Sequence, residues 1–90
     1  MKIVTLCGVG IGTSAILKVT AERALERLDI EAHVTAADVG SIAKVAADAQ
    51  VILTSSELVS AIGKTNADVI VIDNVFDVDE LTAKLEIAIG

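Results

Sequence analysis

Short apolar runs that alternate with helical patterns constrain the fold of this chain more than any other feature. The runs cover residues 2–7, 32–36, 50–54 and 68–73. Their length and β-branched composition predict strands, and the helical pattern after each one predicts parallel strands joined by right-handed crossovers. We therefore expect an α/β fold, a doubly wound four-stranded parallel sheet in the order 2-1-3-4 with helices on both faces.

The first helix is predicted to begin near Thr13 or Ser14 and to run for about 15 residues. Its charged face carries Lys18 and Arg23, among others. Its apolar face consists of Ile16, Leu17, Ala21, Ala24, Leu25 and Leu28. This face is expected to pack on the sheet.

The later helices are expected to be shorter. The Ala-rich segment 39–47 predicts one short helix, and residues 55–62 predict another that ends at Gly63. Asp77, three residues before Glu80, predicts a capping pair for the last helix.

Composition excludes several classes of function. Ninety residues are enough for one domain spanning 1–90. The net charge is −6, and Phe76 is the sole aromatic residue, so neither phosphate attraction nor base stacking favours a nucleic-acid partner.

The chain has no apolar run of the ~18 to 20 residues that a membrane span needs, and its apolar start is too short for a signal peptide. We expect a cytoplasmic protein without direct membrane insertion. A single cysteine and a single histidine predict neither an internal disulfide nor a metal site, and we expect no cofactor.

The segment that follows the first strand carries the strongest chemical signal. Cys7 ends the strand, and a glycine-rich connection leads into the first helix. This connection and the helix start comprise Gly8, Val9, Gly10, Ile11, Gly12, Thr13 and Ser14. Backbone N–H groups here and the positive end of the helix dipole favour a dianionic phosphate, and they also favour a thiolate at Cys7. Ligands of such sheets bind at this carboxyl edge.

Each alternative class of site for this segment requires a particular residue type at a particular position. A dinucleotide fingerprint needs glycine where Thr13 stands, a Walker loop needs a lysine, and a thioredoxin-type site needs a second cysteine. A cysteine phosphatase needs an arginine at the position of Thr13 to stabilise the transition state. A buried structural cysteine is the remaining alternative. The three glycines and two hydroxyl residues that follow Cys7 favour a holding site for a phosphocysteine.

The stretch from Cys7 to Ser14 resembles the phosphocysteine loop of enzyme IIB subunits of the bacterial phosphoenolpyruvate-dependent sugar phosphotransferase system. The ascorbate and galactitol types are expected, because the cellobiose type carries serines and a methionine in place of these loop glycines. The resemblance extends through 16–18 and 22–28 and more loosely through 37–62. It implies a single IIB-like domain related to the phosphatase and flavodoxin-like folds.

The resemblance also implies a relay. A phosphohistidine on phosphorylated enzyme IIA would give its phosphoryl group to Cys7, which would pass it to sugar bound in the IIC membrane transporter. Residues 8–14 would bind the phosphate. A cysteine phosphatase-like enzyme and a non-catalytic regulatory or interaction domain stay open as alternatives.

Few polar residues outside this segment suggest chemistry. His33 stands in the second strand, away from the carboxyl end. Asp38 and Asp73 end the second and fourth strands, where helix capping or solvation is favoured over tuning of the thiol or contact with a partner.

Thr54 and Ser55 close the third strand, where they either line the phosphate site or cap the next helix. Lys18 and Arg23 either meet an acidic partner surface or simply form an ordinary charged helix face.

Overall fold

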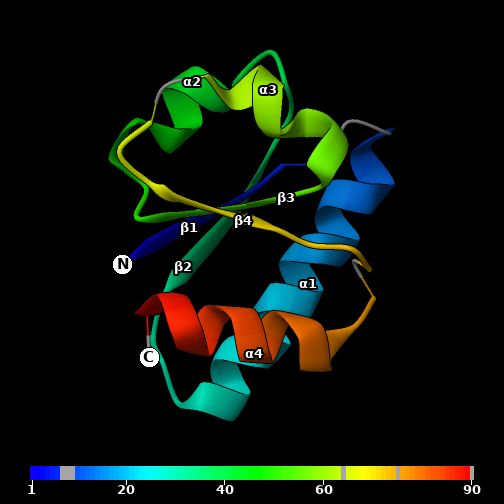
Figure 1. Cartoon of the computed structure of the whole chain (residues 1–90), viewed down its shortest axis with the longest axis vertical. Helices are drawn as coiled ribbons and strands as arrows, with labels where there is room; N and C mark the ends of the chain where they lie inside the picture. The colour runs from blue at the N-terminus through cyan, green and yellow to red at the C-terminus, as the bar shows by residue number, and fades with distance from the viewer. Residues whose placement is uncertain (7–9, 64, 75, 90) are drawn as a thin grey trace.

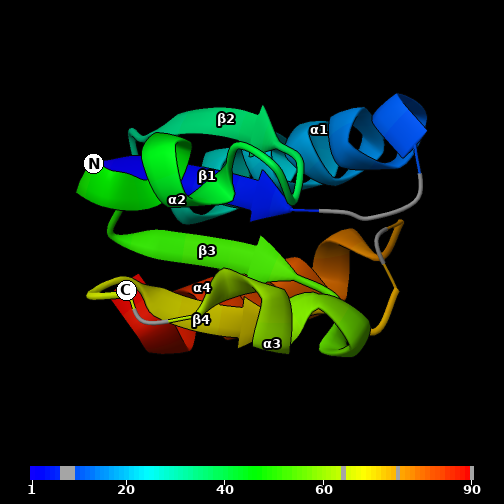
Figure 2. The same cartoon turned by 90° about the horizontal axis from the view of Figure 1, so that it is seen from above.

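The computed structural model describes residues 1–6, 10–63, 65–74 and 76–89, and for residues 10–14 it describes the backbone only. Four strands form one sheet: β1 (Lys2–Leu6), β2 (His33–Ala37), β3 (Val51–Thr54) and β4 (Asp68–Val71). All neighbouring strands are parallel, and their order is β2-β1-β3-β4, which Figure 2 shows from above. The predicted α/β class and strand order are confirmed.

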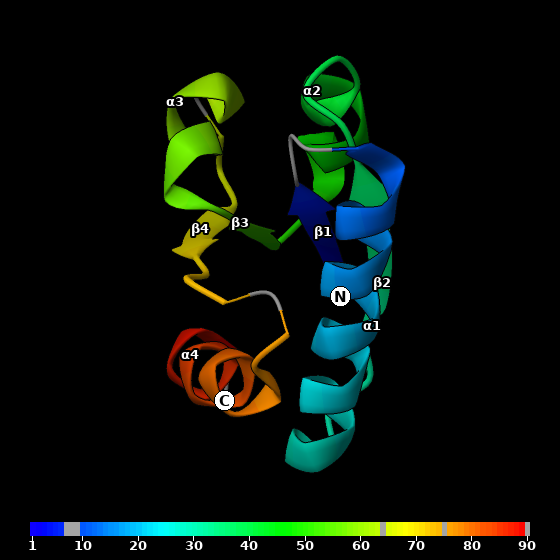
Figure 3. The same ribbon diagram turned by 90° about the vertical axis from the view of Figure 1, so that its right-hand side faces the viewer.

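Helices cover both faces of the sheet, as predicted. They are α1 (Gly10–Leu28), α2 (Ile42–Val45), η1 (Ala46–Asp48), η2 (Ser56–Leu58), α3 (Val59–Ile62) and α4 (Val78–Ile89), where η marks a 3-10 helix. The long helices α1 and α4 lie on one face, and the short helices lie on the other (Figures 1 and 3). Each crossover therefore passes over one face or the other, which makes the sheet doubly wound.

The strands separate two apolar layers. Ile3 of β1 packs with Leu17, Leu25 and Leu85 on the side of the long helices. Its neighbour in the sequence, Val4, packs on the side of the short helices. Successive strand residues point to opposite faces, so a central strand such as β1 is apolar on both. This double burial explains why β1 appears in the sequence as a continuous apolar run.

Helix α1 differs from the prediction at its start and on its face. It begins at Gly10, three residues before the predicted Thr13. Ile16, predicted to be in the core, is 37% exposed, whereas Leu17 is fully buried. Adjacent residues point about 100° apart on a helix, and Ile16 stands on a side of α1 that lines an open groove together with Val78, the first residue of α4.

The predicted turn signals mostly function as expected. Gly63 ends α3 with a φ of +68°, a backbone conformation that glycine adopts without strain. The Asp77 carboxylate accepts the N–H of Glu80 at 3.1 Å and so caps α4. The second half of the capping pair is absent within the described residues, because the Glu80 carboxylate accepts the N–H groups of Asp73 and Asn74.

Candidate functional site

The carboxyl edge of the sheet is where the predicted site residues leave their strands. Leu6 of β1 is in register with Ala37 of β2 and with Thr54 of β3. The residues that follow these three in the sequence therefore leave the sheet at one edge. This edge is the switch point of the doubly wound sheet, where ligands bind in folds of this class.

Cys7, Gly8 and Val9 lie outside the described residues, and they join β1 to α1. The backbone from Gly10 to Ser14 is helical, so Gly10, Ile11 and Gly12 belong to α1 and not to the predicted tight connection. The first N–H groups of an α-helix have no partner within the helix and lie at the positive end of its dipole. Within the described residues, these partner-free N–H groups begin at Gly10, three residues after Cys7 in the sequence.

Thr54 and Ser55 lie at the same edge, but they do not cap the next helix. Thr54 is fully buried, and its hydroxyl lies 3.5 Å from the carbonyl oxygen of Ser55. The Ser55 hydroxyl makes no hydrogen bond within the described part of the chain, and its carbonyl instead accepts the N–H of Leu58 at 3.1 Å. The side-chain capping interpretation of Ser55 is therefore wrong.

The acidic residues after β2 and β4, Asp38 and Asp73, contact neighbouring residues of the fold. Asp38 Oδ1 accepts the N–H of Ser41 at 2.8 Å. Hydrogen bonds from the side chain and backbone of Ser41 lower the pKa of Asp38. Asp73 is 87% exposed on its side chain, and its Oδ2 lies 3.9 Å from Lys84 Nζ. Asp38 thus stabilises the turn before α2 and does not cap the helix itself, and Asp73 is solvated, as favoured; a contribution of either residue to the site stays a prediction. His33 is exposed at the first position of β2, on the opposite edge.

Glu80 holds the connection between β4 and α4, a role that the sequence analysis missed. Its carboxylate accepts the N–H groups of Asp73 at 2.8 Å and Asn74 at 2.9 Å. Lys84 Nζ donates to Glu80 Oε2 and to the Val71 carbonyl, both at 2.6 Å. Partial burial acts to raise the pKa of Glu80, but these hydrogen bonds outweigh it and the pKa is lowered. The i,i+4 spacing of Glu80 and Lys84 is the one signal that the sequence offered.

An apolar groove lies between α1 and this connection, and the sequence analysis missed it as well. Its volume is about 360 Å³. It is lined by Ala15, Ile16, Val19, Thr20 and Arg23 of α1 and by Phe76 and Val78. The sequence signal was Phe76 itself, a lone aromatic residue in a polar segment.

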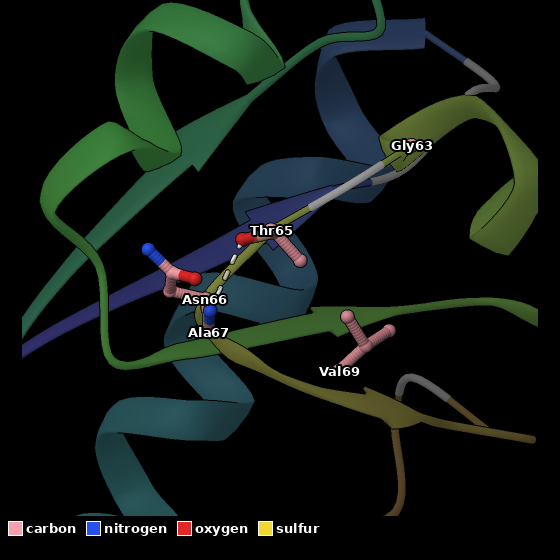
Figure 4. A pocket seen from close by; sticks show the side chains of 5 residues that line it. All are labelled: Gly63, Thr65, Asn66, Ala67 and Val69. Carbon is pink, nitrogen blue, oxygen red and sulfur yellow. Dashed lines mark hydrogen bonds between the residues drawn. The ribbon is translucent and has the colours of Figure 1, made fainter.

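A second hollow lies near the opposite edge of the sheet (Figure 4). Its lining residues are Gly63, Thr65, Asn66, Ala67 and Val69, and Thr65 Oγ1 accepts the N–H of Ala67 at 3.1 Å. None of these residues is titratable. This hollow lies where β4 begins and is not part of the candidate site.

Among the described residues, no cluster of three or more His, Cys, Asp or Glu side chains is suited to a metal ion. No described helix combines the length and apolar character that a membrane crossing requires.

Comparison with known proteins supports the fold and the family. A solved structure, the lactose-specific IIB component domain of the phosphoenolpyruvate:carbohydrate phosphotransferase system from Streptococcus pneumoniae, is similar with a TM-score of 0.72. The identity is 12%, and the similarity covers 100% of this chain and 98% of that chain. At this identity the similarity shows the fold. A search of curated proteins found no significant match.

The family model described as "PTS system, Lactose/Cellobiose specific IIB subunit" matches residues 2–86. The expectation of an ascorbate or galactitol type is therefore wrong. That expectation depended on the glycines between Cys7 and Thr13, whereas the family model matches residues 2–86. The chain belongs to the lactose/cellobiose-specific IIB family of the sugar phosphotransferase system, whose members carry phosphoryl groups in sugar phosphotransfer.

Proposed function

We propose that Cys7 is the residue that carries the phosphoryl group, and that it receives this group from a phosphohistidine of enzyme IIA and passes it to sugar bound by a IIC transporter. The observation that carries the proposal is the position of Cys7. In the sequence it directly follows Leu6, the last residue of β1, and the carboxyl end of β1 lies at the switch point of the sheet.

Each transfer is an in-line displacement at phosphorus. In the first, the Cys7 thiolate attacks, an S–P bond forms, and the N–P bond to the donor imidazole breaks with its electron pair returning to nitrogen. In the second, a sugar hydroxyl attacks, an O–P bond forms, the S–P bond breaks with its electron pair returning to sulfur as the thiolate, and the hydroxyl proton passes to water. Neither step needs an oxidant, reductant or metal-bound intermediate.

Residues 8–14 are proposed to bind the phosphoryl oxygens. Backbone N–H groups at the start of α1 point along the helix axis towards the segment that contains Cys7, and the helix dipole stabilises negative charge there. The hydroxyls of Thr13 and Ser14 are proposed to assist. Because Thr13 replaces the arginine that a cysteine phosphatase uses, we propose that the phosphocysteine is held rather than hydrolysed.

Residues 1–90 are proposed to act as one cytoplasmic domain between two partners, one phosphorylated and one in the membrane. The sugar is expected to be selected by the membrane partner.

The test is incubation with a phosphorylated IIA protein followed by intact-mass and peptide analysis. We expect one phosphoryl group on Cys7 and none on the Cys7→Ser variant. Continuous release of inorganic phosphate would instead identify a phosphatase. Absence of label on the wild-type protein would identify a non-catalytic binding domain and refute the proposal.

A further inference from the structure

Glu80 is an acidic residue that the proposed transfer steps do not use, yet its side chain is only 15% exposed. Its carboxylate accepts hydrogen bonds from the N–H groups of Asp73 and Asn74 and from Lys84 Nζ. Taking a carboxylate out of water is unfavourable unless such partners replace the lost hydration. An apolar side chain would fill the same space, but it would not accept the two N–H groups. The particular effect of Glu80 is therefore that it fixes the backbone of the β4–α4 connection.

The hydrogen bond between Glu80 and the N–H of Asp73 lies between two buried residues. Ile72 directly precedes Asp73, and Leu81 directly follows Glu80. Both side chains are buried, and both belong to the apolar cluster that contains Leu17 of α1. The hydrogen bond therefore fixes the relative position of two side chains in the layer that holds α1. Because protein interiors are close-packed, a displacement of Ile72 or Leu81 is transmitted to the rest of this layer.

Leu17 is the residue through which this layer holds the first turns of α1. Among the side chains of α1 that the structure describes, it is the first that is buried, and Ala15 and Ile16 before it are exposed. These two residues border the groove, whose opposite wall carries Phe76 and Val78. Figures 1 and 3 both place the β4–α4 connection beside α1. The groove leaves space on this side of the helix, so the position of the first turns depends on how Leu17 is packed.

The position of the first turns matters for the proposed phosphate site. Ala15 directly follows Ser14, the last residue of the segment that is proposed to bind the phosphoryl oxygens. The partner-free N–H groups at the start of a helix act on an anion at hydrogen-bond distance, and the dipole effect falls off within one turn. Leu17 follows Gly10 by seven positions, which is about 10 Å along the helix axis. A tilt of the helix about Leu17 therefore displaces these N–H groups.

We propose that Glu80 is a positioning residue for phosphoryl transfer: it joins the end of β4 to the start of α4, and it thereby fixes the packing of Leu17 and the direction of the N–H groups at the start of α1. The inference rests on the proposed function and adds to it a residue that acts through the packing of α1. Because the same N–H groups favour the thiolate and bind the phosphoryl oxygens, loss of Glu80 affects both.

The charge of Glu80 predicts the opposite result from its positioning role. Removing a negative charge, and leaving Lys84 without that partner, would favour the thiolate by electrostatics alone and lower the pH at which Cys7 is half-maximally alkylated. Loss of positioning instead withdraws N–H groups from the thiolate and raises this midpoint. The direction of the change thus separates the two causes.

The first measurement is the pH dependence of Cys7 alkylation by iodoacetamide in wild type, Glu80→Ala and Glu80→Gln, at a temperature at which circular dichroism shows the proteins folded. We expect the midpoint of Glu80→Ala to rise by about 0.3–0.5 pH units, which is about a twofold to threefold change in the thiolate equilibrium. Glu80→Gln keeps one carbonyl acceptor and is expected to shift the midpoint about half as far. It also keeps the test decisive if Glu80→Ala does not fold.

Two control variants separate positioning from stability and from charge. Gly63→Ala lies at the end of α3, on the other face of the sheet, and it opposes folding through the φ of +68°. Glu86→Ala removes the same charge from an exposed position of α4, where salt screens it. Both controls are expected to keep the wild-type midpoint.

The second measurement is the rate of phosphoryl transfer from phosphorylated IIA. In Glu80→Ala the maximal rate is expected to fall about threefold to tenfold, while the IIA concentration at half-maximal rate changes less than about twofold, because the reacting groups and not the docking are displaced. A change in that concentration with an unchanged maximal rate contradicts the positioning role.

An unchanged or lower midpoint in the Glu80 variants overturns the inference, and so does an equal rise in Gly63→Ala. If wild-type protein takes up a phosphoryl group on Cys7 but the Glu80 variants match its midpoint and maximal rate, the inference fails while the proposed function stands. If the midpoint rises as expected but wild-type protein takes up no phosphoryl group, the proposed function fails while the positioning of the thiol's surroundings by Glu80 stands.

Discussion

Replacing Glu80 by alanine tests whether one carboxylate holds the β4–α4 connection in place. The substitution removes two hydrogen bonds from the backbone N–H groups of Asp73 and Asn74 and the ion pair with Lys84. The freed N–H groups lie in exposed residues, so water replaces the lost acceptor. We therefore count the two hydrogen bonds at about 0.5–1 kcal/mol each and the ion pair at about 0.5 kcal/mol.

The expected loss in the free energy of unfolding is about 2 kcal/mol. For a domain of this size, 1 kcal/mol shifts the melting temperature by about 4–8 °C, so Glu80→Ala is expected to melt about 8–16 °C lower. Glu80→Gln keeps one carbonyl acceptor and is expected to lose roughly half as much. Glu86→Ala, at an exposed position of the same helix, is the matched control, with an expected change below about 0.5 kcal/mol.

The contribution of Glu80 to the free energy of unfolding depends on pH. Because hydrogen bonds lower the pKa of Glu80 in the folded protein, its contribution is fully present above the ordinary value of 4.5 and is lost as the pH falls through the folded pKa. Urea unfolding of wild type and Glu80→Ala at pH 7 and at pH 3 measures this directly. The gap between the two proteins should narrow at pH 3. A gap below 0.5 kcal/mol at pH 7, or a gap of equal size at both pH values, contradicts this role of Glu80.

Three further predictions concern the thiol, a turn and the core. Alkylation of Cys7 by iodoacetamide is expected to reach half its maximal rate well below pH ~8.5, because the start of α1 favours the thiolate; a midpoint at the free-thiol value removes that reasoning. Gly63→Ala is expected to cost about 1–2 kcal/mol in chemical unfolding, since a Cβ there meets no neighbour within 4 Å and only the φ of +68° opposes it; an unchanged midpoint contradicts this. Leu85→Ala, at a fully buried position between α4 and the sheet, is expected to lose about 2–5 kcal/mol, whereas Ile87→Ala should lose less than about 0.5; equal losses refute this packing.

The topology was predictable because the buried strands of a parallel sheet appear in the sequence as short apolar runs. Every residue of β3 is buried, so apolar and polar residues do not alternate along this strand. Parallel strands that are joined by helical crossovers can form only a few topologies. The edge strand β4 is only partly buried, and its predicted end at Asp73 was two residues too late. Position in the sheet thus decides how clearly a strand is visible in the sequence.

The start of α1 was not predictable from local propensity. Glycine weakens an isolated helix by about 1 kcal/mol per residue, which favours a later start near Thr13. In the folded chain, α1 is anchored by buried residues such as Leu17 and Ala21, and this packing outweighs the propensity of Gly10 and Gly12.

The residues around the candidate site could not be predicted, because their positions depend on tertiary contacts that the spacing of residues in the sequence does not reveal. The pairing of Glu80 with the N–H groups of Asp73 and Asn74 requires α4 to fold back towards the end of β4. The exposure of Ile16 likewise depends on how the rest of the fold packs against α1. Sequence reasoning therefore predicted a candidate segment, but it could not describe the surface around it.

The central position of β1 also has a consequence for folding during synthesis. β1 is the first strand to be made, but it pairs with β2 on one side and with β3 on the other, and Ile3 is in register with Val51. Contacts this distant in sequence form late and slow the folding of small domains. On the ribosome, more than half of the chain must emerge before β1 has both of its neighbours, so we expect a nascent chain stopped before residue 51 to lack the complete carboxyl edge of the sheet.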